Sequence, residues 1–258
     1  MHLDMILMIY QNSSAIPIIS FCKSNLMEKK NNMYELSVKQ WNPFAGCEHD
    51  CVYCKSSFQR QLKRWARKNC PGCYEFTPHT HPERLNQKLP KTKHMQFIFT
   101  CSNGDIAFCP TEYLKEIIAR IQSEPDKTFL IQSKDPQTFN RAIFPKNVIL
   151  GTTLETNRDK LCEGTSKAPN PSQRYKDFAK VNHQPKMVTI EPVMDFDLDV
   201  MIDWVENINP CMVWLGYDSG KNKLPEPDLE KVRSLHWRLA KKGFVVILKT
   251  IRKAWCEQ

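Results

Sequence analysis

The run Cys47-Glu48-His49-Asp50-Cys51-Val52-Tyr53-Cys54 carries three cysteines in the spacing C-x3-C-x2-C. Three thiolates this close together can bind three irons of a cubic [4Fe–4S] cluster. The fourth iron then has no protein ligand and stays open to a small molecule, whereas an electron carrier usually ligates all four. The spacing therefore indicates chemistry at a cluster. A zinc knuckle and three unrelated buried cysteines are the alternatives, although zinc sites usually have four ligands in paired spacings.

With the aromatic Tyr53 directly before its last cysteine, this run resembles the signature of the radical S-adenosylmethionine (SAM) superfamily. The resemblance implies that Cys47, Cys51 and Cys54 bind the cluster, whose open iron holds the amino and carboxylate groups of SAM. It further implies reductive cleavage of SAM to methionine and a 5′-deoxyadenosyl radical, which abstracts hydrogen from a substrate. An external electron donor such as flavodoxin or ferredoxin is an implied partner.

Further stretches resemble an uncharacterised, phage-associated radical SAM family over most of residues 37–255. They are Trp41-Asn42-Pro43, His81-Pro82-Glu83-Arg84-Leu85, Gly151-Thr152-Thr153-Leu154-Glu155 and Ile190-Glu191-Pro192. The chain departs from that family in its cysteine loop, where many relatives carry extra residues, and in the added pair Cys70 and Cys73. No activity follows from this resemblance. Its nearest mechanistic analogue is spore photoproduct lyase, a radical SAM enzyme of DNA repair.

The composition is ordinary for a soluble protein, with 25% charged and 41% hydrophobic residues among 258. Its 11 cysteines are odd in number and loosely spaced, so they do not form an obvious disulfide framework. Reduced cysteines, several of them on metal, fit a cytoplasmic protein better. Lys and Arg exceed Asp and Glu by nine. That excess favours an anionic partner such as nucleic acid, although a solvated basic surface gives the same count.

Residues 1–33 show a different sequence pattern from the rest of the chain. Apolar patches between residues 3 and 21 are interrupted by polar residues and Pro17, so they predict neither a membrane span nor a secretory signal. We expect residues 1–33 to be a poorly ordered N-terminal extension. Residues 34–258 are expected to form a radical SAM core domain with a Cys/His-containing insert at about residues 69–90.

Short apolar runs alternate with helical patterns after Met33, which predicts parallel strands joined by helices. The expected strands are residues 35–41, 95–100, 129–132, 148–154, 187–191 and 212–217, with 244–249 as a candidate seventh. The expected helices are residues 55–68, 111–123, 137–143, 175–181, 198–208 and 227–242, and residues 70–90 are expected to be irregular. The fold class is α/β, and the resemblance makes it a partial (β/α)6 TIM-like barrel of the radical SAM type.

Active sites of parallel α/β folds gather at the carboxyl ends of the strands. SAM needs an acceptor for its ammonium, a cation for its carboxylate and partners for its ribose hydroxyls. We expect Asp105 to accept from the ammonium, Lys134 to pair with the carboxylate and Glu155 to accept from the ribose hydroxyls. The alternatives are an ordinary Asn-Gly turn before Asp105 and a solvent-exposed position at the rim for Lys134. Glu191 could instead simply pair with Arg158 or Lys249. The predicted SAM-binding residues are Gly104, Asp105, Lys134, Thr153, Glu155 and Glu191.

The insert carries a second group of candidate metal ligands. It reads Cys70-Pro71-Gly72-Cys73 followed by His79-Thr80-His81. Zinc, an auxiliary iron–sulfur cluster and two free thiols all remain open for Cys70, Cys73, His79 and His81.

The helix expected at residues 55–68 has one basic face, opposite an apolar face of Phe58, Leu62 and Trp65. Phosphate contact and simple solvation are both compatible with such a face. Its members are Arg60, Lys63, Arg64, Arg67 and Lys68. Two functions thus remain open. The first is a radical SAM enzyme, with nucleic acid as a candidate substrate. The second is a non-catalytic zinc-dependent nucleic-acid-binding protein.

Overall fold

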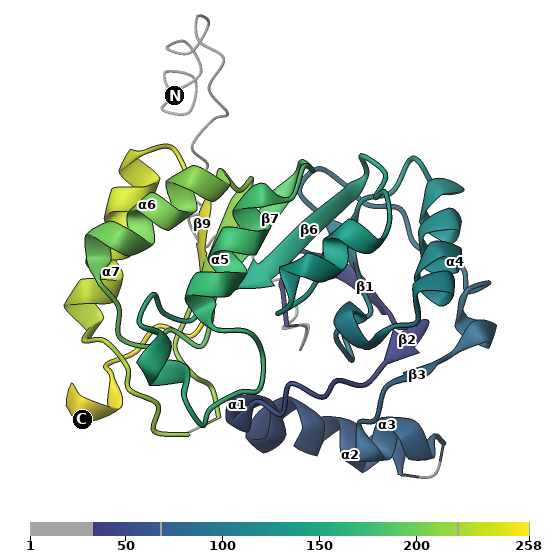
Figure 1. Ribbon diagram of the computed structural model, residues 1–258, viewed down its shortest axis with the longest axis horizontal. Helices are drawn as coiled ribbons and strands as arrows, with labels where there is room; N and C mark the ends of the chain where they lie inside the picture. The colour runs from purple at the N-terminus through teal and green to yellow at the C-terminus, as the bar shows by residue number, and fades with distance from the viewer. Residues whose placement is uncertain (1–32, 68, 221, 258) are drawn as a thin grey trace, which may run out of the picture.

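The computed structural model describes residues 33–67, 69–220 and 222–257 (Figure 1). The predicted N-terminal extension, apart from Met33, therefore lies outside the described residues. Seven parallel strands form one sheet in the order β1-β4-β5-β6-β7-β8-β9. Their bounds are Ser37–Trp41, Phe97–Thr100, Phe129–Gln132, Val148–Thr153, Lys186–Ile190, Met212–Leu215 and Val246–Leu248. The predicted α/β barrel fold is confirmed, with the candidate seventh strand present as β9.

Helices α4 to α7 lie around the outside of the sheet (Figure 1). They are α4 (Thr111–Gln122), α5 (Pro171–Lys180), α6 (Leu198–Ile208) and α7 (Leu229–Lys241). The helix expected at residues 137–143 is instead a 3₁₀ segment, η4 (Pro136–Arg141), which begins at a cap from the Asp135 side chain. Further 3₁₀ turns are η2 (Pro82–Arg84), η3 (Ile106–Phe108), η5 (Asp159–Cys162) and η6 (Trp255–Glu257).

Alternation along the strands sorts the core into two clusters. Side chains such as Ile131 on β5 and Val188 on β7 pack outward with the helices. Their neighbours point inward and form a separate cluster around Tyr34. The Tyr34 ring lies 5.3 Å from the ring of Phe99 on β4 and 4.8 Å from that of Trp214 on β8. One side chain touches strands four positions apart in the sheet, so the sheet is curled into a half-barrel.

The segment after β1 departs from prediction in two places. The basic helix begins and ends earlier than expected, as α1 (Val52–Cys54), a π-helical turn η1 (Lys55–Gln59) and α2 (Arg60–Ala66). Residues 70–90 are not wholly irregular, because they contain α3 (Pro71–Glu75) and β3 (His79–Thr80). Pro71 sits in the first turn of α3, where its missing N–H costs nothing. Strand β3 pairs antiparallel with β2 (Phe44–Ala45), which no local pattern had indicated.

Candidate active site

The loop that carries the three cysteines is fixed at its start by close backbone contacts. Gly46 has φ +95°, and a Cβ built on it would lie 2.1 Å from the Thr77 carbonyl oxygen. The Gly46 N–H donates to Asn103 O at 2.9 Å, and the Asp105 N–H donates to Gly46 O at 3.1 Å. A Cβ at Gly104 would lie 2.5 Å from that same Gly46 oxygen. Gly104 stays a predicted SAM-binding residue; its missing Cβ lets the loop after β4 approach the cysteine loop.

The thiols of Cys47, Cys51 and Cys54 lie close enough to influence one another electrostatically. Burial raises the pKa of Cys47 above its ordinary value, and the nearby Asp105, Cys51 and Cys54 raise it further. Burial likewise raises the pKa of Cys54 to about 11, with a further contribution from Cys51. The Cys51 sulfur lies 3.1 Å from the Ser166 hydroxyl. All three are free thiols, with Cys47 and Cys51 on the loop after β2 and Cys54 at the end of α1. Three soft sulfur donors gathered in this way fit the three protein ligands of an open [4Fe–4S] cluster.

Asp105 ties the cysteine loop to the end of β5. Its carboxylate accepts from the Ser133 hydroxyl at 2.5 Å and from the Lys134 N–H at 2.8 Å. On its other side it lies 3.2 Å from Nε2 of His49, the buried histidine between Cys47 and Cys51. Burial opposes ionisation of Asp105, yet His49 and the hydrogen bonds from Ser133 and Ala107 hold its pKa below the usual range. The carboxylate is thus already engaged within the protein, and its predicted contact with the SAM ammonium stays a prediction.

A charged network joins the cysteine motif to the ends of β5 and β6. The Tyr53 hydroxyl donates to Glu155 Oε1, and the Lys134 ammonium contacts that same oxygen. Lys134 Nζ also lies 4.8 Å from the centre of the Tyr53 ring. The second carboxylate oxygen of Glu155 lies 2.7 Å from Nη2 of Arg174, and both side chains are 1% exposed. Burial alone would raise the pKa of Glu155, but the Arg174 and Lys134 cations outweigh it and hold that pKa well below its usual range.

Two other predicted residues lie at the same mouth. The Thr153 hydroxyl accepts from the Gln132 amide at 2.9 Å, one layer inside the barrel. Glu191 pairs with Lys249, one of the two partners the sequence offered, whereas Arg158 pairs with Asp195 and Asp197. Burial raises the pKa of Glu191 despite the Lys249 cation. The predicted SAM residues therefore cluster at the carboxyl ends of β4 to β7, although no SAM contact is tested by this clustering.

Sequence reasoning missed four contributors to the site: His49, described above, together with Arg174, Ser166 and Tyr53. Arg174 lies on α5, and its guanidinium also donates to the carbonyl oxygens of Pro169 and Thr153. Ser166 lies on a loop that covers the cysteine motif, and Tyr53 was read only as part of a signature. A buried arginine has no local pattern, so only the tertiary fold reveals it. For Tyr53, a hydroxyl next to the third cysteine was a signal that could have been used.

The model of one protein family, described as a protein of unknown function (DUF5131), matches residues 31–228. No protein of curated function matches the chain. Among solved structures, a radical SAM methyltransferase from Sphaerobacter thermophilus is similar with a TM-score of 0.51 and 12% identity, covering 82% of this chain and 65% of that one. SuiB from Streptococcus suis bound to S-adenosylmethionine gives a TM-score of 0.45 and 13% identity, covering 82% of this chain and 50% of that one.

The chain thus spans less than two thirds of the length of either solved structure. At such low identity the methyltransferase likeness supports the barrel fold and does not reach the substrate. No helix in the described part of the chain is both long and apolar enough to cross a membrane.

Proposed function

The chain belongs to the DUF5131 family, and because the family's description names no activity, we propose from the site itself that the protein is a radical SAM enzyme. Cys47, Cys51 and Cys54 would hold a [4Fe–4S] cluster. When bound, such a cluster supplies the electron that cleaves SAM reductively to methionine and a 5′-deoxyadenosyl radical, which takes hydrogen from a substrate. The observation that carries the proposal is the hydrogen bond from Tyr53, inside the cysteine motif, to Glu155 at the end of β6. It joins the segment that carries the three thiols to a buried charged network that a binding module would not need.

The residues of this pocket suit the charged groups of SAM. Lys134 is 15% exposed on its side chain and shares one carboxylate oxygen of Glu155 with Tyr53. It can exchange that oxygen for the SAM carboxylate, because Arg174 stays on the other oxygen and keeps Glu155 ionised. The Glu155 oxygen that Lys134 leaves, to which Tyr53 still donates, can then accept from a ribose hydroxyl. Asp105, Thr153 and Glu191 complete the proposed set, with Gly104 fixing the loop that carries Asp105.

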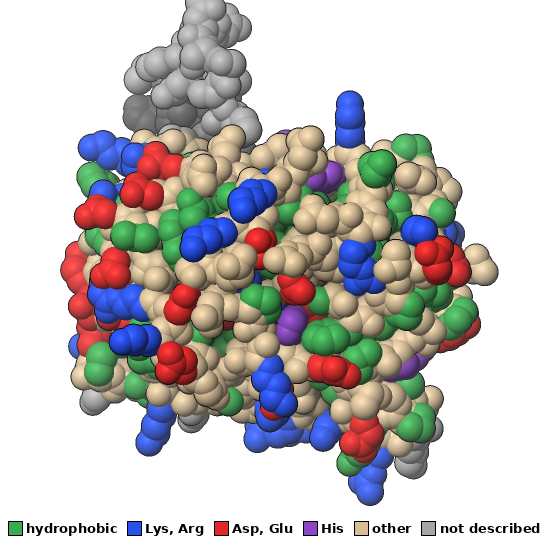
Figure 2. Space-filling view, in the orientation of Figure 1, with side chains coloured by type: hydrophobic (Ala, Val, Ile, Leu, Met, Phe, Trp, Pro, Cys, Tyr) green, Lys and Arg blue, Asp and Glu red, His purple; other side chains and the backbone are tan. Residues whose placement is uncertain are grey.

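Nucleic acid is the substrate class we propose. The basic face holds Arg60, Lys63 and Arg64 on α2 and Arg67 directly after it, and all four are exposed, while Lys68 lies outside the described residues. Lys55, Arg60 and Lys63 also line a shallow hollow with Gln59. Lys and Arg side chains project along the lower edge of Figure 2, the edge along which α1 to α3 lie in Figure 1. A phosphate backbone on this face would pass beside the cysteine loop, since α1 begins inside that loop. The analogy with spore photoproduct lyase points to the same class.

The competing function is a non-catalytic zinc-dependent nucleic-acid-binding protein, which the Cys/His group of the insert favours. Anaerobic purification and reconstitution separate the two functions. The enzyme should be brown, hold about four irons per chain, and release methionine and 5′-deoxyadenosine when given SAM and a strong reductant or flavodoxin. Product release should then be measured with DNA, RNA and peptide pools. A colourless protein that takes up no iron and cleaves no SAM would refute the enzyme and leave the binding module.

A further inference from the structure

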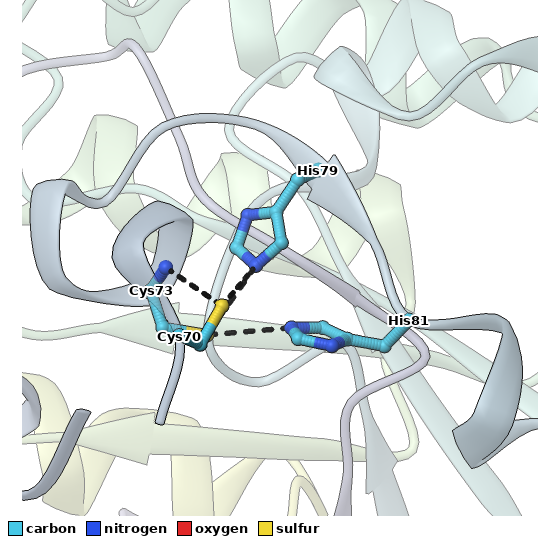
Figure 3. A group of neighbouring side chains, drawn as sticks. All are labelled: Cys70, Cys73, His79 and His81. Carbon is cyan, nitrogen blue, oxygen red and sulfur yellow. Dashed lines mark hydrogen bonds between the residues drawn. The ribbon is translucent and has the colours of Figure 1, made fainter. Parts of the chain in front are cut away.

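In the insert next to the cysteine loop, four side chains of types that can bind a metal ion lie close together (Figure 3). Cys70 and Cys73 come from the start of α3, and His79 and His81 come from β3 and the residue after it. Their ligand atoms all lie within 4.8 Å of one another, and Cys73 and His81 are buried. We propose that Cys70, Cys73, His79 and His81 form a closed, structural Zn²⁺ site. This inference does not rest on the proposed enzymatic function.

The hydrogen bonds of the two histidines favour a cation at the centre of the group. His79 Nδ1 lies 2.7 Å from the Thr77 carbonyl oxygen, and His81 Nδ1 lies 3.0 Å from a Glu83 carboxylate oxygen. Both partners only accept, so Nδ1 carries the hydrogen in each ring. In the neutral rings, the lone pairs therefore sit on Nε2, and both Nε2 atoms face cysteine sulfur. Backbone or carboxylate partners on the far nitrogen are the usual second layer of a zinc–histidine site.

The distances match a tetrahedron around zinc. His79 Nε2 lies 3.3 Å from the Cys70 sulfur and 3.4 Å from the Cys73 sulfur. His81 Nε2 lies 3.3 Å from the Cys73 sulfur. Zinc bonds of ordinary length, about 2.3 Å to sulfur and about 2.0 Å to nitrogen, give sulfur–nitrogen edges of about 3.5 Å in a tetrahedron. These three sulfur–nitrogen edges therefore need to lengthen by only a few tenths of an ångström.

The ligand set distinguishes zinc from an auxiliary iron–sulfur cluster. Clusters are held mainly by cysteine thiolates, whereas two thiolates and two imidazoles are a common structural zinc set. Four protein ligands leave no open coordination position, which makes the site structural.

The site lies where the insert meets the cysteine loop. Strand β3, which carries His79, pairs with β2 just before Gly46, and the Cys47 N–H donates to Phe76 O at 3.2 Å. The apolar cluster beneath α2 and α3 is small, with Ala45, Leu62, Ala66, Cys73 and Phe76 as its buried members. A metal would therefore supply order that this core cannot supply alone.

The test is the metal content of the full-length protein, with zinc and iron measured together by mass spectrometry. We expect about one zinc per chain, retained in Cys51→Ala and lost in Cys73→Ser. Cys211→Ser serves as the matched control, because Cys211 lies just before β8, at the opposite end of the barrel, and it should keep its zinc. Glu83→Ala keeps all four ligands and should weaken zinc affinity about tenfold to a hundredfold in a chelator competition.

Cobalt substitution of the wild-type protein keeps the test decisive if Cys73→Ser does not fold. Cobalt in this site should give the intense visible bands of tetrahedral S₂N₂ coordination together with sulfur-to-cobalt charge transfer. The proposal is overturned if zinc persists in Cys73→Ser or if the wild-type protein holds no zinc. It is also overturned if protein purified under reducing conditions contains a Cys70–Cys73 disulfide, or if it contains iron and sulfide in place of zinc.

Discussion

Replacing Arg174 by Met tests the buried charged network at the barrel mouth. Arg174 and Glu155 are both 1% exposed and lie 2.7 Å apart, so the substitution leaves a carboxylate without its main cation. Removing one partner of a buried ion pair costs about 3–5 kcal/mol. For a chain of this size that corresponds to a fall in melting temperature of roughly 6–20 °C. The assay is urea unfolding of the reduced protein at neutral pH, together with a thermal melt.

A matched control has the same chemistry at the surface. Arg238 lies 2.7 Å from Asp199, with side chains that are 36% and 81% exposed. An exposed pair of this kind contributes about 1 kcal/mol or less, so Arg238→Met should be close to the wild type. Equal losses of stability in the two variants would contradict the role given to burial. Adding Glu155→Gln to Arg174→Met should recover stability, because the unpaired charge is then gone.

The pH dependence supplies an independent check. The folded-state pKa of Glu155 lies well below its ordinary value of about 4.3, so its ionised form stabilises the protein above that value. This contribution is lost as the pH falls toward the folded-state pKa. In Arg174→Met the buried carboxylate has lost its main cation, so protonation relieves the penalty. The difference in unfolding free energy between wild type and variant should therefore shrink below about pH 4. A difference that stays constant with pH would refute the assignment.

Three further outcomes test the proposed function. Cys51→Ala should abolish cluster binding and SAM cleavage, and full iron content in this variant would remove the ligand assignment. Lys134→Ala should keep its cluster but bind SAM roughly tenfold to a hundredfold more weakly in equilibrium titrations; unchanged affinity would contradict the pocket. Reversing Arg60, Arg64 and Arg67 to Glu should weaken DNA or RNA binding broadly and flatten its salt dependence, while SAM cleavage without substrate survives. A wild type without salt-sensitive affinity at low ionic strength would show that this face is only solvated.

Strands β4, β6, β7 and β8 were predictable because each is a short run buried along its whole length, which leaves a strong local signal. Strand β5 was predicted with its observed bounds. Strand β9 was predicted only as a candidate, and in the structure its residues are partly exposed at the edge of the sheet. Strand β2 escaped prediction because two residues carry no periodicity. It is followed directly by Gly46, whose positive φ only the folded loop requires.

The site was predictable as far as chain order fixes it. Asp105, Lys134 and Glu155 follow successive strands, so parallel pairing alone brings them to one edge. Their partners were not predictable in the same way. Arg174 reaches Glu155 from a helix, and His49 reaches Asp105 from a loop. Both are long-range pairings whose geometry depends on how the barrel closes.

These long-range contacts share one consequence for the cysteine loop. It is held by Gly46 against the turn after β4, by His49 against Asp105, and by Tyr53 against Glu155. These anchors lie before the first cysteine, between the first two cysteines and directly before the last one. A loop fixed in this way has little conformational freedom left to lose when a ligand binds. Ordering a free loop would cost about 1–2 kcal/mol per residue. The anchors therefore favour binding of a cofactor to these cysteines, and each anchor ends on a residue proposed to contact SAM or fix its pocket. The same side chains that line the proposed SAM site thus also hold the three proposed cluster ligands beside it.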